Sequence, residues 1–503
     1  MAERDASGEG SGPDSGGIGG TGKAGGGEGT ENAGTAGGRA GQSKTVLARR
    51  ASTRHALRRR WRHFRYVSLS QEVWKRRLVF VAGAVAVGLT AVGFAYCADK
   101  AQEIYRHILK EWPWVPLLMM PVGFAALAYV TRRWFPAAPG SGIPQVIAAR
   151  NSKDFEFRRS LLGFDTLVGK IVMTSMGMLI GASVGREGPT VQIGASVMFA
   201  IGSIAGIGRH NGLVLAGSAA GVAAAFNAPL AGILFAIEEL AKAYAGRINE
   251  FIIASVVIGG AVSWIILGQY AYFGEVAARL IDAQDWLAVP ACAVVGGVTG
   301  ALFSKTLVQL TRSPPRPIAA LRRHPMAFAA VCGLLVACMS IATAGYASGS
   351  GYDETRQGLV HGTLMPWWYG FAKLIATLAS SLSGIPGGLF SPSLAVGAGM
   401  GSMAAKVMTF IDPRTMMLLM MAAYFSGVVQ SPMTATVIVM EMTSDRNMII
   451  PLMAASLLAA SISRLISREP LYHALAKSYA PHVFEHRRPA RSRHWHPGAK
   501  DQP

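Results

Sequence analysis

The feature that most constrains the fold of this chain is a series of long segments that carry almost no charge. Between Thr166 and Leu240 the only charged side chains are Lys170, Arg186, Glu187, Arg209, Glu238 and Glu239. An apolar helix of about 20 residues is long enough to cross a bilayer. Only helices or closed barrels satisfy the backbone in hydrocarbon, and this sequence lacks the alternation of barrel strands. We therefore predict an all-α protein that crosses a membrane many times.

The composition agrees with this prediction, because only 15% of the 503 residues are charged, against roughly a quarter in soluble proteins. The four cysteines lie in apolar segments without the paired spacing of a metal site, so we expect no disulfide, no metal and no cofactor. The sequence has no HExxH motif and no paired intramembrane His and Asp residues. We therefore expect that the protein is not an enzyme.

The net charge of +20 is concentrated at the two ends of the chain. Residues 44–78 contain twelve Lys or Arg residues and one acid, and the C-terminal tail adds five more basic residues. Basic residues beside the first and last apolar helices are typical of cytoplasmic ends, and they can also contact anionic membrane lipids. Both termini are therefore predicted to be cytoplasmic. Binding to a nucleic acid is the disfavoured alternative.

The sequence divides into four predicted regions. Residues 1–43 form a Gly-rich tail with almost no large apolar side chains, and residues 44–77 form a basic cytoplasmic segment. A membrane domain covers 78–480, with halves at about 78–270 and 285–466 and a last helix at about 469–480. Residues 481–503 form a basic cytoplasmic tail. Several apolar segments are short and interrupted by Gly or Pro, which is typical of transporters with broken helices.

An internal repeat relates the two halves. Seven residues recur 203 positions later, in the pairs Lys170/Lys373, Gly181/Gly384, Gly185/Gly388, Pro189/Pro392, Gly194/Gly397, Pro229/Pro432 and Glu238/Glu441. Duplicated membrane units place their site where the halves meet. We favour an inverted relation, because broken helices then converge from opposite sides.

Three glycine-rich turns each precede a predicted helix: Gly140-Ser-Gly-Ile-Pro144, Gly185-Arg-Glu-Gly-Pro189 and Gly388-Leu-Phe-Ser-Pro392. Proline near the first helical turn, with glycine before it, predicts a tight loop that leads into a helix N-terminus. The free N–H groups and the positive dipole end of such a terminus favour anions. Termini that meet within the membrane would bind an anion with neutral donors, from which a permeating ion can leave again.

These three turns, in this order, resemble the signature motifs of the CLC chloride channel and transporter family. Residues 227–239 and Pro470-Leu471-Tyr472 resemble two further segments of that family. The resemblance covers about residues 78–480 and implies a CLC-type inverted-repeat fold with many tilted, broken helices. It also implies a homodimer with one pore in each subunit, as in bacterial inner-membrane members without C-terminal regulatory domains.

The resemblance assigns the chloride ligands to the hydroxyls of Ser141 and Tyr472 and the backbone N–H groups of Leu389 and Phe390. The selectivity loops around them contain Gly140, Gly142, Pro144, Gly185, Arg186, Gly188, Pro189, Gly388 and Pro392. Serine at position 141 favours chloride, because nitrate-preferring members of the family tend to carry proline there.

Glu187 is an acid inside an apolar segment, where a charge is costly and by default marks an ion or proton pathway. At a helix N-terminus its carboxylate would occupy the position that an anion prefers. It can therefore block the pathway when charged and release it when protonated. The resemblance assigns it the role of external gating glutamate. The alternative is a buried ion pair with Arg186.

Glu238 and Glu239 differ in their relation to the repeat. Glu238 has a counterpart in Glu441 and lies four residues before Lys242, so a helix salt bridge would explain it. Glu239 has an apolar counterpart, Met442, and the resemblance assigns it to internal proton transfer. The sequence therefore favours chloride/proton exchange. The alternative is a passive voltage- or pH-gated chloride channel of the same fold.

Overall fold

A computed structural model describes residues 71–208, 210–240, 250–268 and 270–479. The predicted Gly-rich tail, the basic residues before Gln71 and the C-terminal basic tail lie outside this range. The described part of the chain is almost entirely helical, as predicted. The first helix, α2 (Gln71–Glu111), begins before the apolar segment that starts near Leu78, so it includes the last residues of the basic segment.

The helices follow the predicted apolar segments. In the first half, α2 is followed by α3 (Pro116–Trp134), α4 (Ile143–Asn151), α5 (Phe155–Leu162), α6 (Phe164–Leu179), α7 (Glu187–Ile204), α8 (Asn211–Phe226), α9 (Pro229–Phe235), the π-helical turn η1 (Ala236–Leu240) and α10 (Glu250–Leu267). The second half contains η2 (Ala283–Leu287), α11 (Ala288–Arg312), α12 (Arg316–Arg322), α13 (Pro325–Ala342), α14 (Tyr352–His361), α15 (Tyr369–Leu382), α16 (Phe390–Val407), α17 (Pro413–Val429), α18 (Pro432–Thr443), α19 (Ile449–Ile466) and α20 (Leu471–Tyr479).

Equivalent breaks interrupt the helices in both halves. Helix α8 is followed by Asn227 and helix α17 by Gln430, 203 positions later. Both residues adopt left-handed backbone conformations, with φ of 55° and 61°. A proline begins the next helix in each case, because proline fits the first helical turn and cannot continue the previous helix. The repeat in the sequence is therefore also a repeat of backbone structure.

Reciprocal hydrogen bonds join the two halves. Gly185 N–H donates to the carbonyl of Gly388 at 2.9 Å, and Gly388 N–H donates to the carbonyl of Gly185 at 2.8 Å. Gly185 and Gly388 occupy equivalent positions in the two repeats. A pair of equal and opposite hydrogen bonds between them is expected where a two-fold axis relates the repeats. Helices α7 and α16 begin two residues after these glycines, so their N-termini lie close together. This arrangement agrees with the predicted inverted repeat.

A second reciprocal contact caps two helices. The carboxylate of Glu238 accepts hydrogen bonds from the N–H groups of Met433 and Thr434 at the start of α18, at 3.3 and 2.7 Å. The carboxylate of Glu441 does the same at the start of α9, with Leu230 and Ala231 at 3.2 and 2.6 Å. The predicted partner of Glu238, Lys242, lies outside the described residues. Glu238 therefore has a structural role that joins the repeats.

These caps predict an effect on stability. Replacing Glu441 by alanine leaves the first N–H groups of α9 without their acceptor, so it should reduce the free energy of unfolding by about 1–2 kcal/mol. By symmetry, Glu238→Ala should cost a similar amount. Thermal unfolding of the purified protein in detergent would measure both. Unchanged midpoints in both variants would contradict the capping role.

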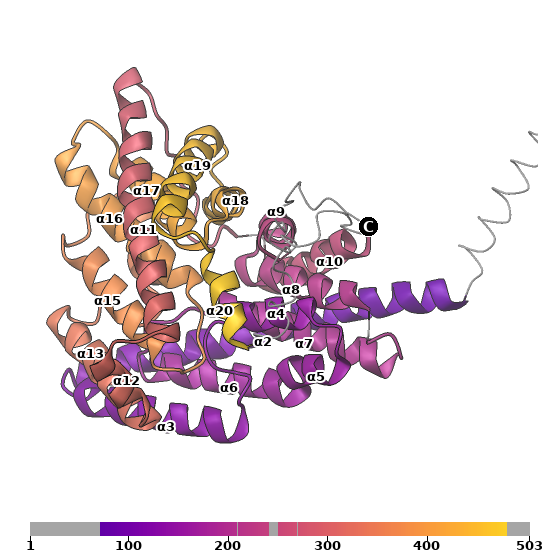
Figure 1. Cartoon of the computed structure of the whole chain (residues 1–503). Helices are drawn as coiled ribbons and strands as arrows, with labels where there is room; N and C mark the ends of the chain where they lie inside the picture. The colour runs from indigo at the N-terminus through magenta and orange to yellow at the C-terminus, as the bar shows by residue number, and fades with distance from the viewer. Residues whose placement is uncertain (1–70, 209, 241–249, 269, 480–503) are drawn as a thin grey trace, which may run out of the picture. The chain divides into compact units, whose positions relative to one another are not determined.

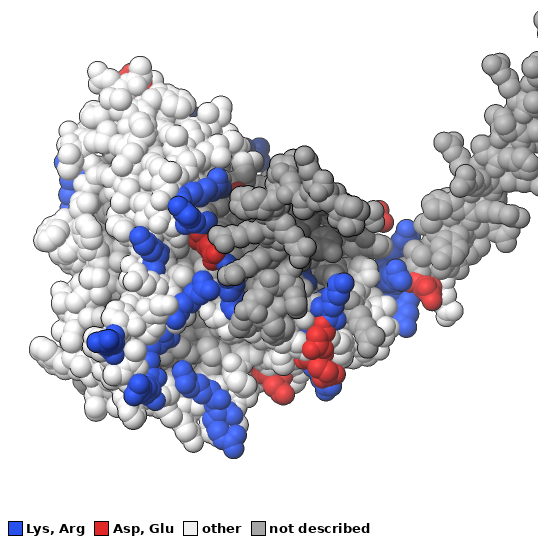
Figure 2. Space-filling view, in the orientation of Figure 1, with Lys and Arg blue, Asp and Glu red and all other residues white. Residues whose placement is uncertain are grey.

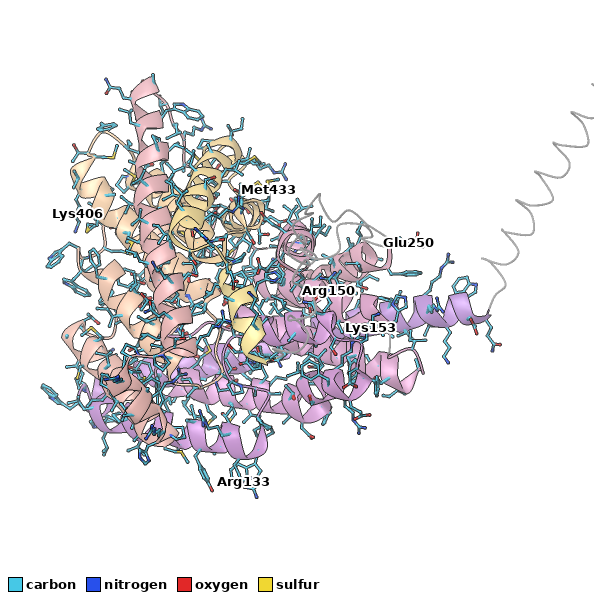
Figure 3. All side chains as sticks on the ribbon, viewed as in Figure 1. Arg133, Arg150, Lys153, Glu250, Lys406 and Met433 are labelled. Atoms are coloured by element: carbon cyan, nitrogen blue, oxygen red, sulfur yellow. The ribbon has the colours of Figure 1, made fainter. Side chains whose placement is uncertain are left out.

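Within the described residues, six helices are long and apolar enough to cross a membrane: Trp74–Glu111, Phe155–Leu179, Glu250–Leu267, Ala283–Arg312, Pro325–Ala342 and Ile449–Ile466. Figure 1 shows the helices of the first half (indigo to magenta) in the lower and right parts of the view and those of the second half (orange to yellow) mainly on the left and above. Much of the face in Figure 2 is uncharged, which suits contact with lipid. Figure 3 labels charged residues at or near helix ends, among them Arg133, Glu250 and Lys406.

Candidate functional site

The three glycine-rich turns predicted from the sequence meet in the structure. The N–H of Gly140 donates to the carbonyl of Ile385, and the N–H of Gly387 donates to the carbonyl of Gly140, both at 3.1 Å. The reciprocal bonds of Gly185 and Gly388 join the other two turns. A Cβ atom at Gly388 would lie 2.8 Å from the carbonyl oxygen of Gly185 and 2.9 Å from the nitrogen of Gly188, so this close backbone approach requires glycine.

Each turn leads into a helix N-terminus, as predicted. Helix α4 begins at Ile143 with Pro144 in its first turn, α7 begins at Glu187 before Pro189, and α16 begins at Phe390 before Pro392. No side chain caps any of these three termini. Their free N–H groups, including those at Leu389 and Phe390, therefore remain available to a bound anion.

Among the buried hydroxyls that have no hydrogen-bond partner within the described residues, two lie at or beside these turns. They belong to Ser141, whose turn precedes α4, and to Tyr472 of α20, which is fully buried. The Tyr472 ring stacks on Phe390 with ring centroids 6.2 Å apart, which places it beside the α16 N-terminus. A buried hydroxyl that lacks a partner loses its hydration without compensation, so it is expected to bind a ligand or water. A hydroxyl can donate to an anion without adding charge.

Glu187 is the first residue of α7 and is almost completely buried. Its Oε1 accepts hydrogen bonds from the Tyr272 hydroxyl at 2.9 Å and from the Ser391 hydroxyl at 2.6 Å. Arg186 instead forms an ion pair with Asp99 at 2.5 Å. The alternative predicted for Glu187, a buried ion pair with Arg186, is therefore not formed in the described structure.

A cavity of about 320 Å³ reaches this glutamate. It is lined by residues of α2, the start of α7, the segment after α10, and the start of α14. Arg186 and Glu187 both contribute to its wall, together with Tyr272 and Tyr352. A buried carboxylate beside a polar cavity can exchange protons with the water in that cavity.

Glu239 lies in the π-helical turn η1 and is fully buried, whereas its neighbour Glu238 is only partly buried. The Ser431 hydroxyl donates to Glu239 Oε2 at 2.5 Å. His473 Nε2 lies 3.1 Å from the backbone carbonyl of Glu239 and 3.8 Å from Oε1. Tyr472, the residue before His473, is within electrostatic range of both Glu187 and Glu239. The Tyr472 side chain therefore lies near both acids.

The structure reveals a fourth glycine-rich turn that the sequence analysis missed. Gly349-Ser350-Gly351 precedes α14 as Gly140-Ser141-Gly142 precedes α4, and all four glycines have positive φ. The buried Lys170 donates to the carbonyls of Ala138 and Gly140, and its repeat mate Lys373 donates to those of Ala347, Ser348 and Gly349. The signal was present in the sequence as another Gly-Ser-Gly in the membrane domain, but at an offset of 209 rather than 203.

Three further residues near the two acids carried no signal of their own in the sequence. Tyr272 lies in the segment between α10 and η2, Ser391 lies inside a motif that was assigned through its backbone, and His473 follows Tyr472. No periodicity or spacing connects them with Glu187 or Glu239, because their contacts arise from chain segments far apart in the sequence.

This combination of features defines a class of protein. It is a polytopic α-helical membrane protein built from an inverted repeat, with helix N-termini that converge on buried hydroxyls. A family model described as voltage gated chloride channel matches residues 122–464. The protein belongs to this family, the CLC family of chloride channels and transporters, as its sequence motifs predicted.

Solved structures share the fold. One, described as a slow cyanobacterial Cl⁻/H⁺ antiporter, is 20% identical and matches with a TM-score of 0.68 over 80% of this chain and 97% of that chain. A CLC-type fluoride/proton antiporter is 19% identical, with a TM-score of 0.67 over 81% and 99%. A eukaryotic CLC transporter is 20% identical, with a TM-score of 0.63 over 80% and 74%. These matches confirm the predicted CLC-type architecture.

Proposed function

We propose that this protein exchanges chloride for protons across a membrane, with Glu187 as the gate and Glu239 as the internal proton-transfer group. The observation that carries this proposal is the presence of two almost fully buried carboxylates in one membrane domain, with the Tyr472 side chain near both. Intramembrane acids are costly and are retained where protons or ions pass. The solved relatives described as Cl⁻/H⁺ and fluoride/proton antiporters support the same activity.

The proposed chloride site uses only neutral donors. Its ligands are the hydroxyls of Ser141 and Tyr472 and the backbone N–H groups of Leu389 and Phe390. The hydroxyls are buried without a partner, and the α16 terminus is uncapped. Neutral donors compensate for the lost hydration of chloride without the strong attraction of a full positive charge, so the ion can leave as well as enter.

Glu187 couples the two ions in this proposal, because its carboxylate and chloride compete for the positive end of α7 and the neighbouring termini. When the carboxylate is charged it occupies the pathway, and when it takes up a proton from the cavity it can move aside. Glu239, buried beside Ser431 and His473, would supply protons from the other side. We further propose a homodimer in contact with membrane lipids, located in a bacterial inner membrane with cytoplasmic termini.

The test of this function is simultaneous measurement of chloride and proton flux from liposomes that contain the purified protein. An outward chloride gradient should drive protons uphill in the opposite direction. Chloride flux without coupled proton movement would instead select the passive channel.

Selectivity gives a separate prediction. Replacing Ser141 with proline removes one hydroxyl donor that suits the small, spherical chloride ion. The ratio of nitrate to chloride transport should therefore rise several-fold in anion exchange assays. Ser350→Pro, at the equivalent place in the fourth turn, serves as the matched control and should leave the ratio unchanged. A constant ratio in Ser141→Pro would contradict the role of Ser141 as a ligand.

A further inference from the structure

We propose that the hydroxyls of Tyr272 and Ser391 form a clasp that holds Glu187 in its closed position and sets the pH at which the anion pathway opens. The inference rests on the proposed function of Glu187 as the gate. It adds two positioning residues, which act through Glu187 and not on chloride itself.

The clasp is defined by two donors on one oxygen. The Tyr272 and Ser391 hydroxyls both donate to Glu187 Oε1, at 2.9 and 2.6 Å, and they lie 3.5 Å from each other. All three side chains are at most 3% exposed. The donors come from separate places, since Tyr272 follows α10 and Ser391 lies in the first turn of α16. The clasp therefore ties the start of α7 to the second half of the molecule.

The other carboxylate oxygen of Glu187 is in a different position. Oε2 is buried and has no hydrogen-bond partner among the described residues. It faces Gly185, where an added Cβ would collide with it. A proton can therefore bind Oε2 without displacing either hydroxyl. Once Oε2 is protonated, Oε1 becomes a neutral carbonyl oxygen, and hydrogen bonds to a neutral acceptor are roughly half as strong as those to a carboxylate. Protonation therefore weakens the clasp.

The Tyr272 ring is held in a fixed orientation. It packs edge-on against Tyr352 and Phe273, with ring centroids 4.9 and 5.0 Å apart. The guanidinium carbon of Arg186 lies 5.7 Å from the centre of the Tyr272 ring. The N–H of Phe273 donates to the carbonyl of Met442 in α18 at 2.8 Å, which anchors the segment. A donor that is already held in place loses little conformational entropy when it bonds to Glu187. Little of the free energy of this hydrogen bond is therefore offset.

The charged groups around Glu187 are already paired with one another. Three carboxylates line the cavity beside it: Asp99, Glu103 and Asp353. Asp99 pairs with Arg186, Glu103 with Lys100, and Asp353 with Arg106. The other titratable groups in this wall are the hydroxyls of Tyr270, Tyr272 and Tyr352, and Tyr472 lies on the inner side. Glu187 forms no ion pair among the described residues, although Arg186 interacts with it electrostatically. The two hydroxyls are the side chains that donate hydrogen bonds to its carboxylate.

Tyr272→Phe tests the clasp, because it removes one donor and keeps the ring. Chloride flux from liposomes is measured as a function of pH with the full-length protein. A hydrogen bond to a charged group favours the charged form by about tenfold, so without this bond Glu187 should take up its proton at a higher pH. The midpoint of the curve of chloride flux against pH should therefore shift by about one pH unit toward alkaline values. Ser391→Ala should shift it in the same direction, and proton transport should persist because Glu187 remains. Tyr270→Phe is the matched control, since Tyr270 lines the same cavity without bonding to Glu187.

The outcomes separate the clasp from the gate. An unchanged midpoint in Tyr272→Phe, with thermal unfolding equal to that of the wild type, would overturn the clasp. So would an equal shift in Tyr270→Phe, or a shift that persists when Tyr272→Phe is combined with Glu187→Ala. Failure of the proposed function has a different signature, because the wild type would then move no protons, or Glu187→Ala would keep the pH dependence of the wild type.

Discussion

Replacing Glu187 with alanine should abolish proton transport and leave chloride flux that no longer depends on pH. The reason is that Glu187 is the only acid at the three converging helix termini, among the described residues. In the proposed mechanism its carboxylate competes with chloride for their N–H groups. Without the carboxylate, nothing at this position alternates between a charged and a neutral state. Chloride then passes without a proton being taken up or released.

The measurement is the ratio of proton to chloride flux in liposomes, followed at several pH values. The coupled proton flux should fall below detection in Glu187→Ala, and chloride flux should be equal at acidic and neutral pH. Glu187→Gln should behave in the same way, because the amide fills the same space but does not titrate. Proton pumping that survives in the alanine variant would remove Glu187 from the mechanism.

Glu239→Gln should stop proton transport while chloride flux persists. Glu239 is fully buried and its Oε2 accepts a hydrogen bond from Ser431, so a titratable group sits where water has little access. Glutamine preserves the shape of the side chain and can still accept from Ser431, but it cannot carry a proton. The chloride ligands are unchanged, so anion flux should remain within a few-fold of that of the wild type.

Glu238→Gln is the internal control for this experiment. The two glutamates are neighbours, but Glu238 caps α18 through the N–H groups of Met433 and Thr434. Its replacement should lower the thermal unfolding midpoint and leave coupling intact, because the amide is a weaker acceptor than the carboxylate. If the Glu238 variant loses coupling and the Glu239 variant still pumps protons, the assignment of Glu239 is wrong.

Sequence alone was informative wherever a local rule applied. The helices could be placed because hydrocarbon requires apolar side chains and satisfied backbone groups over about 20 residues. The starts of α7 and α16 at Glu187 and Phe390 follow from glycine and proline, whose backbone preferences are local. Glu187 could be selected because a charge in an apolar segment is costly. Glu239 was separated from Glu238 because it has no acidic counterpart in the second repeat, and its role came from the family resemblance. Ser141 and Tyr472 entered only through the family resemblance.

The partners of these residues were decided by the tertiary structure. Glu187 was predicted to face an anion site or Arg186, yet its hydroxyl donors lie 85 and 204 positions away along the chain. Glu238 was expected to pair with Lys242, which lies outside the described residues, and no local pattern indicated that Glu238 caps a helix of the other repeat. The fourth turn was missed because an insertion shifted its offset. Hydrogen bonds require atoms within about 3.5 Å. Which groups come that close depends on how helices distant in the sequence pack together, and no local pattern of residues contains that information.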